Sequence, residues 1–265
     1  MTLLTILLGT LIAGIGSVWL AAWLSFGVLS RYTQHMLSLA AGALLATAFL
    51  HLLPEAFEGQ AGAHGLFMTL LLGLVFFFLL DKAELWHHGH EHHHSGHHGG
   101  HQHAHHHHGH DHPSVAGKWA VLAGDSVHCF GDGILIASAF IADFSLGVLA
   151  ALAVLAHEVP HHMGDLVVLR EGSDNRKAAI LKVSMAGAVT ALGGTVGYVL
   201  VDALHDFLPY FLVVASSSFI YVALADLIPQ LQKRLSAKET AAQVAWLGVG
   251  MGMVLAVSTL AAQHH

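Results

Sequence analysis

The stretch HEVPHHMGD, residues 157–165, is the part of this sequence that most constrains its fold. It gathers three histidines and two acidic residues around a proline, and apolar residues flank it on both sides. Its first five letters match HExxH, a pattern in which two histidines one helical turn apart bind a metal and the glutamate activates water. Because ionisable side chains are costly in apolar surroundings, their concentration here indicates a functional site.

The composition indicates that these surroundings are a membrane. Hydrophobic residues make up 55% of the 265 residues, charged residues make up 10%, and the mean hydropathy is +0.63. A soluble domain carries about 25% charged residues. Because a helix needs about 20 residues to cross a hydrocarbon core, we expect an all-α polytopic membrane protein with eight spans. The spans are predicted at residues 3–28, 36–56, 65–85, 115–141, 145–170, 178–203, 208–231 and 241–262.

The basic residues are sorted to one side of this arrangement. All ten fall at or between spans 1 and 2, 3 and 4, 5 and 6, or 7 and 8, whereas the tails and the other connections contain none. Since lysine and arginine accumulate in cytoplasmic loops, we predict that both termini lie outside the cell (inner) membrane. No basic surface remains for nucleic acid. The ten residues are Arg31, Lys82, Lys118, Arg170, Arg176, Lys177, Lys182, Lys233, Arg234 and Lys238.

A histidine-rich tract, HHGHEHHHSGHHGGHQHAHHHHGHDH, occupies residues 87–112. It has almost nothing that could form a core, so residues 87–114 are predicted to be a disordered cytoplasmic loop. The loop joins spans 1–3, within residues 1–86, to spans 4–8, within residues 115–265, of one membrane domain. Imidazole binds zinc, copper, nickel and iron, so the tract indicates metal binding. The alternative is a dispensable repeat expansion that binds metal incidentally.

Span 4 contains a first set of candidate ligands in GDSVHCFGDG, residues 124–133. His128 and Asp132 are four residues apart and therefore share one helical face. Cys129 lies about 100° to the side of that face. The set falls near the middle of its span, where a polar cluster has few structural explanations.

Span 5 repeats this arrangement on two adjacent faces. His157 and His161 form one i,i+4 pair. Glu158 and His162 form a second pair. If spans 4 and 5 are antiparallel neighbours, the two sets meet near the bilayer midplane, where transporter sites commonly lie. A buried acidic side chain costs about 2.5–3.5 kcal/mol there, and a bound divalent cation offsets that cost.

Two further acidic residues have no assigned role at this stage. Asp125 precedes the ligand set in span 4, and Asp165 continues the face of His157 and His161 by one further turn. An intramembrane aspartate often makes an interhelical hydrogen bond. For these two residues, metal binding and such a hydrogen bond both remain open.

Pro160 separates this stretch from a metalloprotease motif. Proline has no N–H, so the carbonyl of Ala156 loses its helical partner and the helix is expected to kink. A protease would need both histidines at regular spacing on an unbroken helix, whereas a transporter gains from an interrupted helix whose polar groups face a cavity.

These features together resemble the ZIP (Zrt-, Irt-like) divalent metal transporters. The resemblance rests on the eight spans, the external termini, the histidine-rich loop, the His-x-x-x-Asp-Gly of residues 128–133, and the stretch HEVPHHMGD. HLLPEAFE, residues 51–58, is similar to the end of the second span in the branch with many eukaryotic members. The resemblance covers essentially the whole chain. It implies a ZIP-type helical bundle, often dimeric, that moves zinc or a related ion toward the cytoplasm.

The resemblance also implies two neighbouring metal positions. The residues that match the main transport site are His128, Asp132, His157 and His161. The residues that match or adjoin the second site are Cys129, Glu158 and His162. Cys129 stands where the family commonly has asparagine, and His162 stands where many members have glutamate. Span 6 offers only Ser184 and Thr190 where some members carry a carboxylate, so occupancy by two metals remains open.

We therefore predict a homodimeric transporter in the lipid bilayer, not an enzyme. It needs no cofactor and carries Zn²⁺, with Fe²⁺, Mn²⁺, Cd²⁺ and Ni²⁺ as further candidate substrates. Three or four imidazole and carboxylate ligands with exchangeable water suit a borderline cation and allow its release. Two alternatives remain. One is an intramembrane zinc metalloprotease with Glu158 as its base, and the other is a membrane metal sensor or buffer built around residues 87–112.

Overall fold

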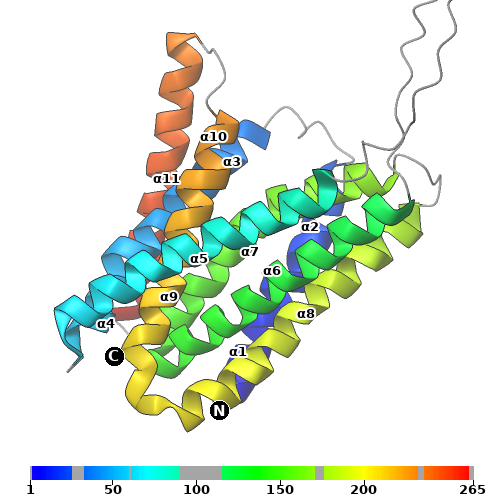
Figure 1. Ribbon diagram of the computed structural model, residues 1–265. Coiled ribbons are helices and arrows are strands. Elements are labelled where there is room, and N and C mark those ends of the chain that lie inside the picture. Colours follow the sequence, from blue (N-terminus) through cyan, green and yellow to red (C-terminus); the bar gives the residue numbers. More distant parts are fainter. Residues whose placement is uncertain are drawn as a thin grey trace, which may run out of the picture.

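The computed structural model describes residues 2–25, 33–59, 61–89, 115–170, 176–231 and 236–262. Within these ranges all regular structure is helical (Figure 1). In chain order the elements are α1 (Thr2–Leu11), the π-helix η1 (Ile12–Gly16), α2 (Ser17–Ser25), α3 (Thr33–Thr47), the π-helix η3 (Ala48–Leu52), α4 (Leu53–Glu58), α5 (Ala63–Gly89), α6 (Val115–Ala142), α7 (Phe144–Arg170), α8 (Arg176–Ala203), the 3-10 helix η5 (His205–Phe207), α9 (Leu208–Tyr221), the π-helix η6 (Val222–Leu227), α10 (Ile228–Leu231) and α11 (Ala237–Ala262).

The predicted all-α fold and its eight spans are confirmed within the described residues. Eight helical stretches there are long and apolar enough to cross a membrane. The limits differ by a few residues from the predicted ones; the first stretch, for example, is Thr2–Leu24. Figure 1 shows both chain ends at the same end of the bundle, and α5 ends and α6 begins at the opposite end. An even number of spans places both chain ends on the same side of the membrane.

Three of the spans contain a π-helical segment that the sequence pattern did not predict. η1 interrupts the first span between α1 and α2, η3 interrupts the second between α3 and α4, and η6 interrupts the seventh between α9 and α10. A π-helical turn inserts an extra residue into the helix and frequently occurs at functional sites. The first of these segments ends immediately before Ser17, which takes part in the site described below.

The packing of the helices places α6 and α7 inside the bundle. α6 packs against both α7 and α8, and α7 also packs against α2 and α3 (Figure 1). α3 packs in turn against α11, and α5 against α9. α6 and α7 run antiparallel because only Asp143 separates them. The expected pairing of spans 4 and 5 is therefore present.

Glycines allow α6 and α8 to approach closely. A Cβ atom added to Gly133 would collide with the backbone oxygen of Thr190. In the reverse direction, one added to Gly193 would collide with the backbone oxygen of Phe130. Small residues at such positions let membrane helices pack backbone to backbone. This contact fixes α6 against α8 on the side away from α7.

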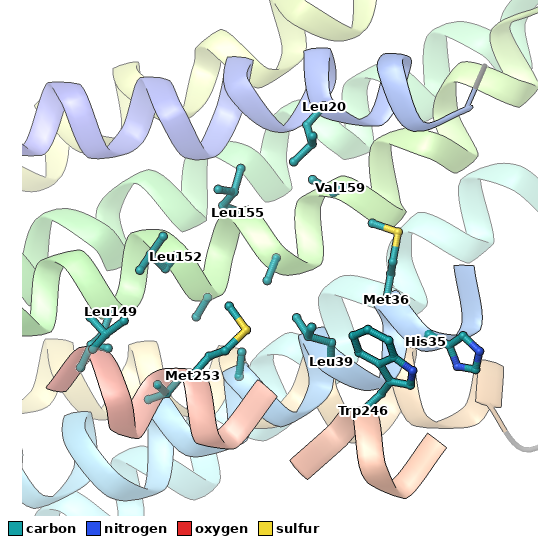
Figure 2. A pocket seen from close by; sticks show the side chains of 15 residues that line it. Leu20, His35, Met36, Leu39, Leu149, Leu152, Leu155, Val159, Trp246 and Met253 are labelled. Atoms are coloured by element: carbon teal, nitrogen blue, oxygen red, sulfur yellow. The ribbon is translucent and has the colours of Figure 1, made fainter. Parts of the chain in front are cut away.

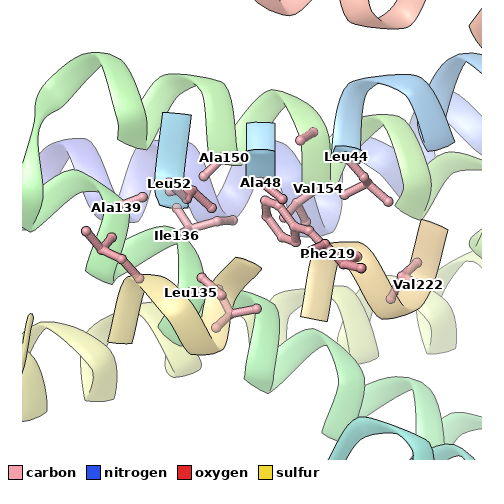
Figure 3. Packing of buried hydrophobic residues seen from close by; sticks show 14 of the residues in the cluster. Leu44, Ala48, Leu52, Leu135, Ile136, Ala139, Ala150, Val154, Phe219 and Val222 are labelled. Carbon is pink, nitrogen blue, oxygen red and sulfur yellow. The ribbon is translucent and has the colours of Figure 1, made fainter. Parts of the chain in front are cut away.

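The main apolar core lies among α3, α6, α7 and α9. Figure 3 shows Leu52 of η3, Ile136 of α6, Val154 of α7 and Phe219 of α9 packed together. All four side chains are essentially inaccessible to solvent. This core holds the C-terminal half of α6 and the N-terminal half of α7 together, next to the polar residues of both helices.

α7 has two faces with different chemistry. One face, which includes Leu152, Leu155 and Val159, lines an apolar cavity of about 480 Å³ between α2, α3 and α11 (Figure 2). The other face carries the histidines and acidic residues of HEVPHHMGD. The helix continues through Pro160 without interruption. Pro160 therefore removes one hydrogen bond, the one to the carbonyl of Ala156, but α7 remains a single helix.

The histidine-rich tract is mostly outside the described residues. α5 continues to Gly89, so residues 87–89 are helical. The sequence pattern instead predicts a disordered loop for them. The expectation for residues 90–114 falls outside the described ranges. Arg176 begins α8 and Lys238 lies in the first turn of α11, at the same end of the bundle as the end of α5. Within the described residues, the starts of α8 and α11 thus bring basic residues to this end.

Candidate metal centre

Four side chains from the middle of α6 and α7 form a first group: His128, Asp132, His157 and Glu158. Their ligand atoms all lie within 4.8 Å of one another. Nε2 of His157 is 3.1 Å from Oδ2 of Asp132 and 3.4 Å from Oε1 of Glu158. Nε2 of His128 is 3.3 Å from Nε2 of His157. The ring nitrogens and carboxylate oxygens therefore converge on one point.

Hydrogen bonding orients His157 within this group. Its Nδ1 is 3.2 Å from the backbone oxygen of Ala153, one turn earlier in α7. A carbonyl oxygen can only accept a hydrogen bond, so Nδ1 carries the proton and donates. The lone pair of the neutral ring is then on Nε2, the atom that faces the group. Such a second hydrogen bond is typical of metal-binding histidines.

A second group lies one turn away and consists of Asp125, Cys129, Glu158 and His162. Nε2 of His162 is 3.1 Å from Oε2 of Glu158 and 3.5 Å from Oδ1 of Asp125. Sγ of Cys129 is 3.6 Å from Oδ1 of Asp125. Glu158 belongs to both groups, because its two oxygens point to different sets of ligands. Its carboxylate therefore bridges the two groups.

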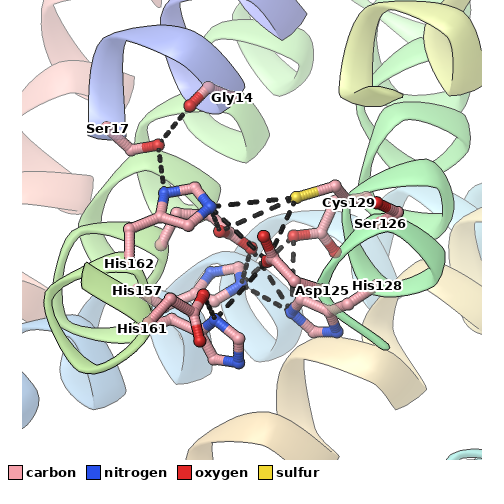
Figure 4. A network of polar contacts seen from close by, with 12 residues as sticks. Gly14, Ser17, Asp125, Ser126, His128, Cys129, His157, His161 and His162 are labelled. Atoms are coloured by element: carbon pink, nitrogen blue, oxygen red, sulfur yellow. Dashed lines mark hydrogen bonds and ion pairs between the residues drawn. The ribbon is translucent and has the colours of Figure 1, made fainter. Parts of the chain in front are cut away.

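Ser17 of α2 orients His162, as Figure 4 shows. The serine hydroxyl donates its only hydrogen to the backbone oxygen of Gly14. Its oxygen also lies 3.0 Å from Nδ1 of His162, where it can therefore only accept. Nδ1 of His162 is thus the protonated nitrogen, and Nε2 presents its lone pair to the second group. The first span contributes to the site in this way without contributing a ligand.

A third group continues the series and consists of Asp125, His161 and Asp165. Nδ1 of His161 is 3.6 Å from Oδ1 of Asp125 and 3.4 Å from Oδ2 of Asp165. The ring of His161 stacks on that of His128, with centroids 5.5 Å apart and an interplanar angle of 18°. Asp125 belongs to both the second and the third group.

The structure brings all seven candidate ligands into one connected cluster, but it divides them differently from the expectation. His128, Asp132 and His157 stand together as expected, and the fourth member of their group is Glu158. His161, expected in the main site, lies in the third group. Cys129, Glu158 and His162 meet as expected, with Asp125 as an additional member.

Nearly all of these ligands are removed from solvent. Asp132, His157, Glu158 and His162 are each at most 2% exposed. Four buried carboxylate oxygens accept no hydrogen bond within the described part of the chain. They are Oδ2 of Asp125, Oδ2 of Asp132, Oε1 of Glu158 and Oδ2 of Asp165.

A divalent cation suits this environment. Buried carboxylate oxygens that accept no hydrogen bond are strongly unfavourable unless a cation or a proton neutralises them. Imidazole together with carboxylate is a ligand set for zinc and similar borderline cations, and a thiol shifts the preference toward softer ones. The three groups therefore have the chemistry of a multinuclear metal centre.

Comparison with known proteins gives a family assignment. The model of the ZIP zinc transporter family matches residues 1–258. Zinc transporter ZIP13 of Pongo abelii is 29% identical over 252 residues, which cover 85% of this chain. Zinc transporter ZIP4 of Homo sapiens is 29% identical over 258 residues, which cover 78% of this chain.

The shared region makes up very different fractions of the relatives. It spans 69% of ZIP13 but 40% of human ZIP4. In zinc transporter ZIP10 of Danio rerio, which is 33% identical over 113 residues, it spans 13%. This chain thus covers less than half the length of several curated relatives that it matches.

The family consists of transporters and not of enzymes, in agreement with the sequence-based prediction. The family match extends over all eight membrane-spanning helices, including α6 and α7, which carry the three groups. This chain is a multi-pass membrane protein that belongs to the ZIP zinc transporter family.

Proposed function

We propose that this protein imports zinc into the cytoplasm through the first and second groups, which α6 and α7 hold near the bilayer midplane. The observation that carries the proposal is the position of Glu158, whose two oxygens face the two groups. A shared carboxylate can keep hold of a cation while the other ligands exchange. Transport requires such stepwise exchange, because a site that holds the ion with every ligand at once releases it slowly.

Zinc is the ion that the ligands and the relatives favour together. The first group offers two imidazoles and two carboxylates, which suit a borderline divalent cation. The relatives compared above are named zinc transporters. Fe²⁺, Mn²⁺, Cd²⁺ and Ni²⁺ are further candidate substrates, and Cys129 favours Cd²⁺ among them. Zinc is here a substrate in transit and not a resident cofactor.

The proposed direction follows from the basic residues. Those within the described residues gather at the end of the bundle where α5 ends and α6 begins, and basic ends face the cytoplasm. In this orientation both termini lie outside the cell (inner) membrane, the histidine-rich loop of residues 87–114 is cytoplasmic, and zinc leaves the centre toward that loop. Histidine is a good zinc ligand, so the loop is proposed to modulate uptake. We further propose that the protein works as a homodimer.

The geometry argues against peptide hydrolysis at HEVPH. In an HExxH protease both histidines bind the same zinc and the glutamate remains free to act as a base. Here His157 and His161 lie in different groups, and Glu158 lies between the ligands of two groups. These are the positions of metal ligands rather than of a general base beside a substrate cleft.

Zinc uptake into proteoliposomes that contain the purified protein tests the proposal. We expect saturable uptake in the wild type, loss of uptake in Glu158→Gln, and normal uptake in Asp206→Asn, which changes an exposed acid of η5 that belongs to none of the three groups. Binding of zinc without uptake by the wild type would refute import and favour the sensor or buffer. Cleavage of a membrane peptide that disappears in Glu158→Gln would instead favour the protease.

A further inference from the structure

The third group, Asp125, His161 and Asp165, has no role in the two-position site proposed above. It is nevertheless built like the other two. Its three ligand atoms lie within 4.8 Å of one another, and Asp125 and Asp165 are 3% and 8% exposed. Oδ2 of Asp165 and Nδ1 of His161, which face each other across 3.4 Å, are buried atoms without a hydrogen bond in the described residues. A polar cluster that only stabilised the helix pair would be expected to satisfy such atoms.

The position of the third group continues a regular series along α6 and α7. The ligands step backward along α6 from Asp132 to Asp125 and forward along α7 from His157 to Asp165. At about 1.5 Å per residue, each series covers roughly 10–12 Å along its helix axis. The helices are antiparallel, so both series descend toward the same membrane surface. This is the surface at which α6 begins and α7 ends.

Successive groups share one carboxylate. Glu158 is common to the first and second groups, and Asp125 is common to the second and third. A cation that moves down the series can therefore bind its next ligands before it has left the previous ones. The third group also differs from the others in exposure, because the side chain of His161 is 38% exposed. Three ligands and an open side leave room for water, which is typical of sites that exchange their metal.

We propose that Asp125, His161 and Asp165 form a third binding position for a divalent cation, the last one on the path before release at the basic end of the bundle. This inference rests on the proposed function for the direction of movement only. Binding at the third position can be tested without any transport.

A thiol introduced at Asp165 provides a specific signal, because thiolate bound to Cd²⁺ absorbs in the ultraviolet whereas imidazole and carboxylate ligands do not. The histidine-rich tract contains no cysteine and is therefore silent in this measurement. We expect Asp165→Cys to add a cadmium–thiolate band to any band that Cys129 gives in the wild-type protein. Gly164→Cys is the matched control, since position 164 is exposed and has nothing within 4 Å of its added Cβ. It should add no band.

Second substitutions locate the ligands that accompany the new thiol. In the Asp165→Cys background, His161→Ala should remove the additional band, whereas His157→Ala, which alters only the first group, should leave it in place. The proposal is wrong if Asp165→Cys adds no band or if His161→Ala leaves the band unchanged. It is also wrong if His157→Ala removes the band, because the groups would then act as one site.

This titration and the zinc uptake assay can fail independently. An additional band without zinc uptake would support the third position and refute the importer. Uptake that depends on Glu158 without an additional band would support the importer and refute the third position.

Discussion

At the scale of single residues, hydrogen bonds to backbone and hydroxyl oxygens decide which atom of a histidine can bind a metal. His157 donates to a carbonyl of its own helix, so its orientation is determined within α7. His162 instead depends on Ser17, which is 145 residues away in the sequence and reaches it from the first span. The serine thus orients a candidate ligand from a different span. In this chain, the orientation of His162 therefore requires Ser17.

Replacement of Ser17 by alanine should weaken metal binding without removing a ligand. In Ser17→Ala, Nδ1 of the buried His162 loses its acceptor, so the ring is free to present an N–H to the second group. Loss of such a hydrogen bond to a metal-binding histidine typically reduces metal affinity by about 10–100-fold. We expect a loss in this range for Zn²⁺, measured by competition with a chelator of known affinity. The tautomer of His162, observed by nitrogen NMR, should shift in the same variant.

Ser126→Ala is the control for this prediction. Ser126 lies in α6 next to Asp125, but its hydroxyl donates to the backbone oxygen of Leu122 in its own helix. Its removal should leave zinc affinity unchanged. Equal affinities for Ser17→Ala and the wild type would mean that the serine only packs against the ring.

Much of this site could be predicted from the sequence, because its residues follow helical periodicity. Spacings of three and four residues place His128, Asp132 and the two pairs of HEVPHH on faces that meet when the helices are antiparallel. The same spacing relates Asp125 to Cys129, so membership of Asp125 in the second group was accessible in principle. The contribution of Ser17 was not, because one serine in an apolar span carries no periodic signal. The separation of His161 from His157 also needed coordinates, since i,i+4 residues share a face but need not share a metal.

At the scale of secondary structure elements, the contact between α6 and α8 holds the ligand-bearing helix in place. Gly133 directly follows Asp132, a candidate ligand, and it faces the backbone of α8 at Thr190. A candidate ligand of α6 and a close contact of α6 with the backbone of α8 thus occur in adjacent residues. Any displacement of α6 from α8 would move Asp132 as well.

Gly133→Ala should therefore destabilise the protein more than Gly131→Ala. The added methyl group at Gly133 has no space, and overpacking of this kind typically costs about 1–3 kcal/mol. At Gly131 nothing lies within 4 Å of an added Cβ, so alanine should be tolerated there. We expect a lower midpoint of thermal unfolding in detergent for Gly133→Ala alone. Both substitutions remove a glycine from the interior of the same helix, so the difference between them reports the contact. Similar midpoints in the two variants would show that α8 can move away at little cost.

The number of spans and their approximate limits could be predicted because apolar length alone determines them. The three π-helical segments could not be predicted. An extra residue in one helical turn leaves the apolar composition and the approximate length of a span unchanged. η1 nevertheless changes the register of the first span immediately before Ser17, so that the direction in which Ser17 points depends on it. This is a feature of local geometry that hydrophobic periodicity does not encode. For this reason the contact between Ser17 and His162 could not be predicted from the sequence.

At the scale of the whole molecule, the three groups and the distribution of charge define one direction. The carboxylate-bridged series runs along α6 and α7 toward the end where the described basic residues gather. If that end faces the cytoplasm, the third group is the exit of the path and the histidine-rich loop lies beyond it. If it faces outward, the same movement along the series would release the ion outside, and the protein would be oriented for export. The orientation thus decides the physiological meaning of the whole series.

Single cysteines at the two ends of the bundle determine this orientation. Gly62 lies in the short connection before α5 and is exposed, with nothing within 4 Å of an added Cβ, so Gly62→Cys should not disturb packing. Ala237, exposed at the start of α11, is the matching position at the basic end. The native Cys129 is 0% exposed and should contribute little background. We expect a membrane-impermeant maleimide added to intact cells to label Gly62→Cys, and to label Ala237→Cys only after the membrane is opened. The reverse pattern would contradict the proposed direction of transport, whereas labelling of both positions from outside would contradict the eight-span topology itself.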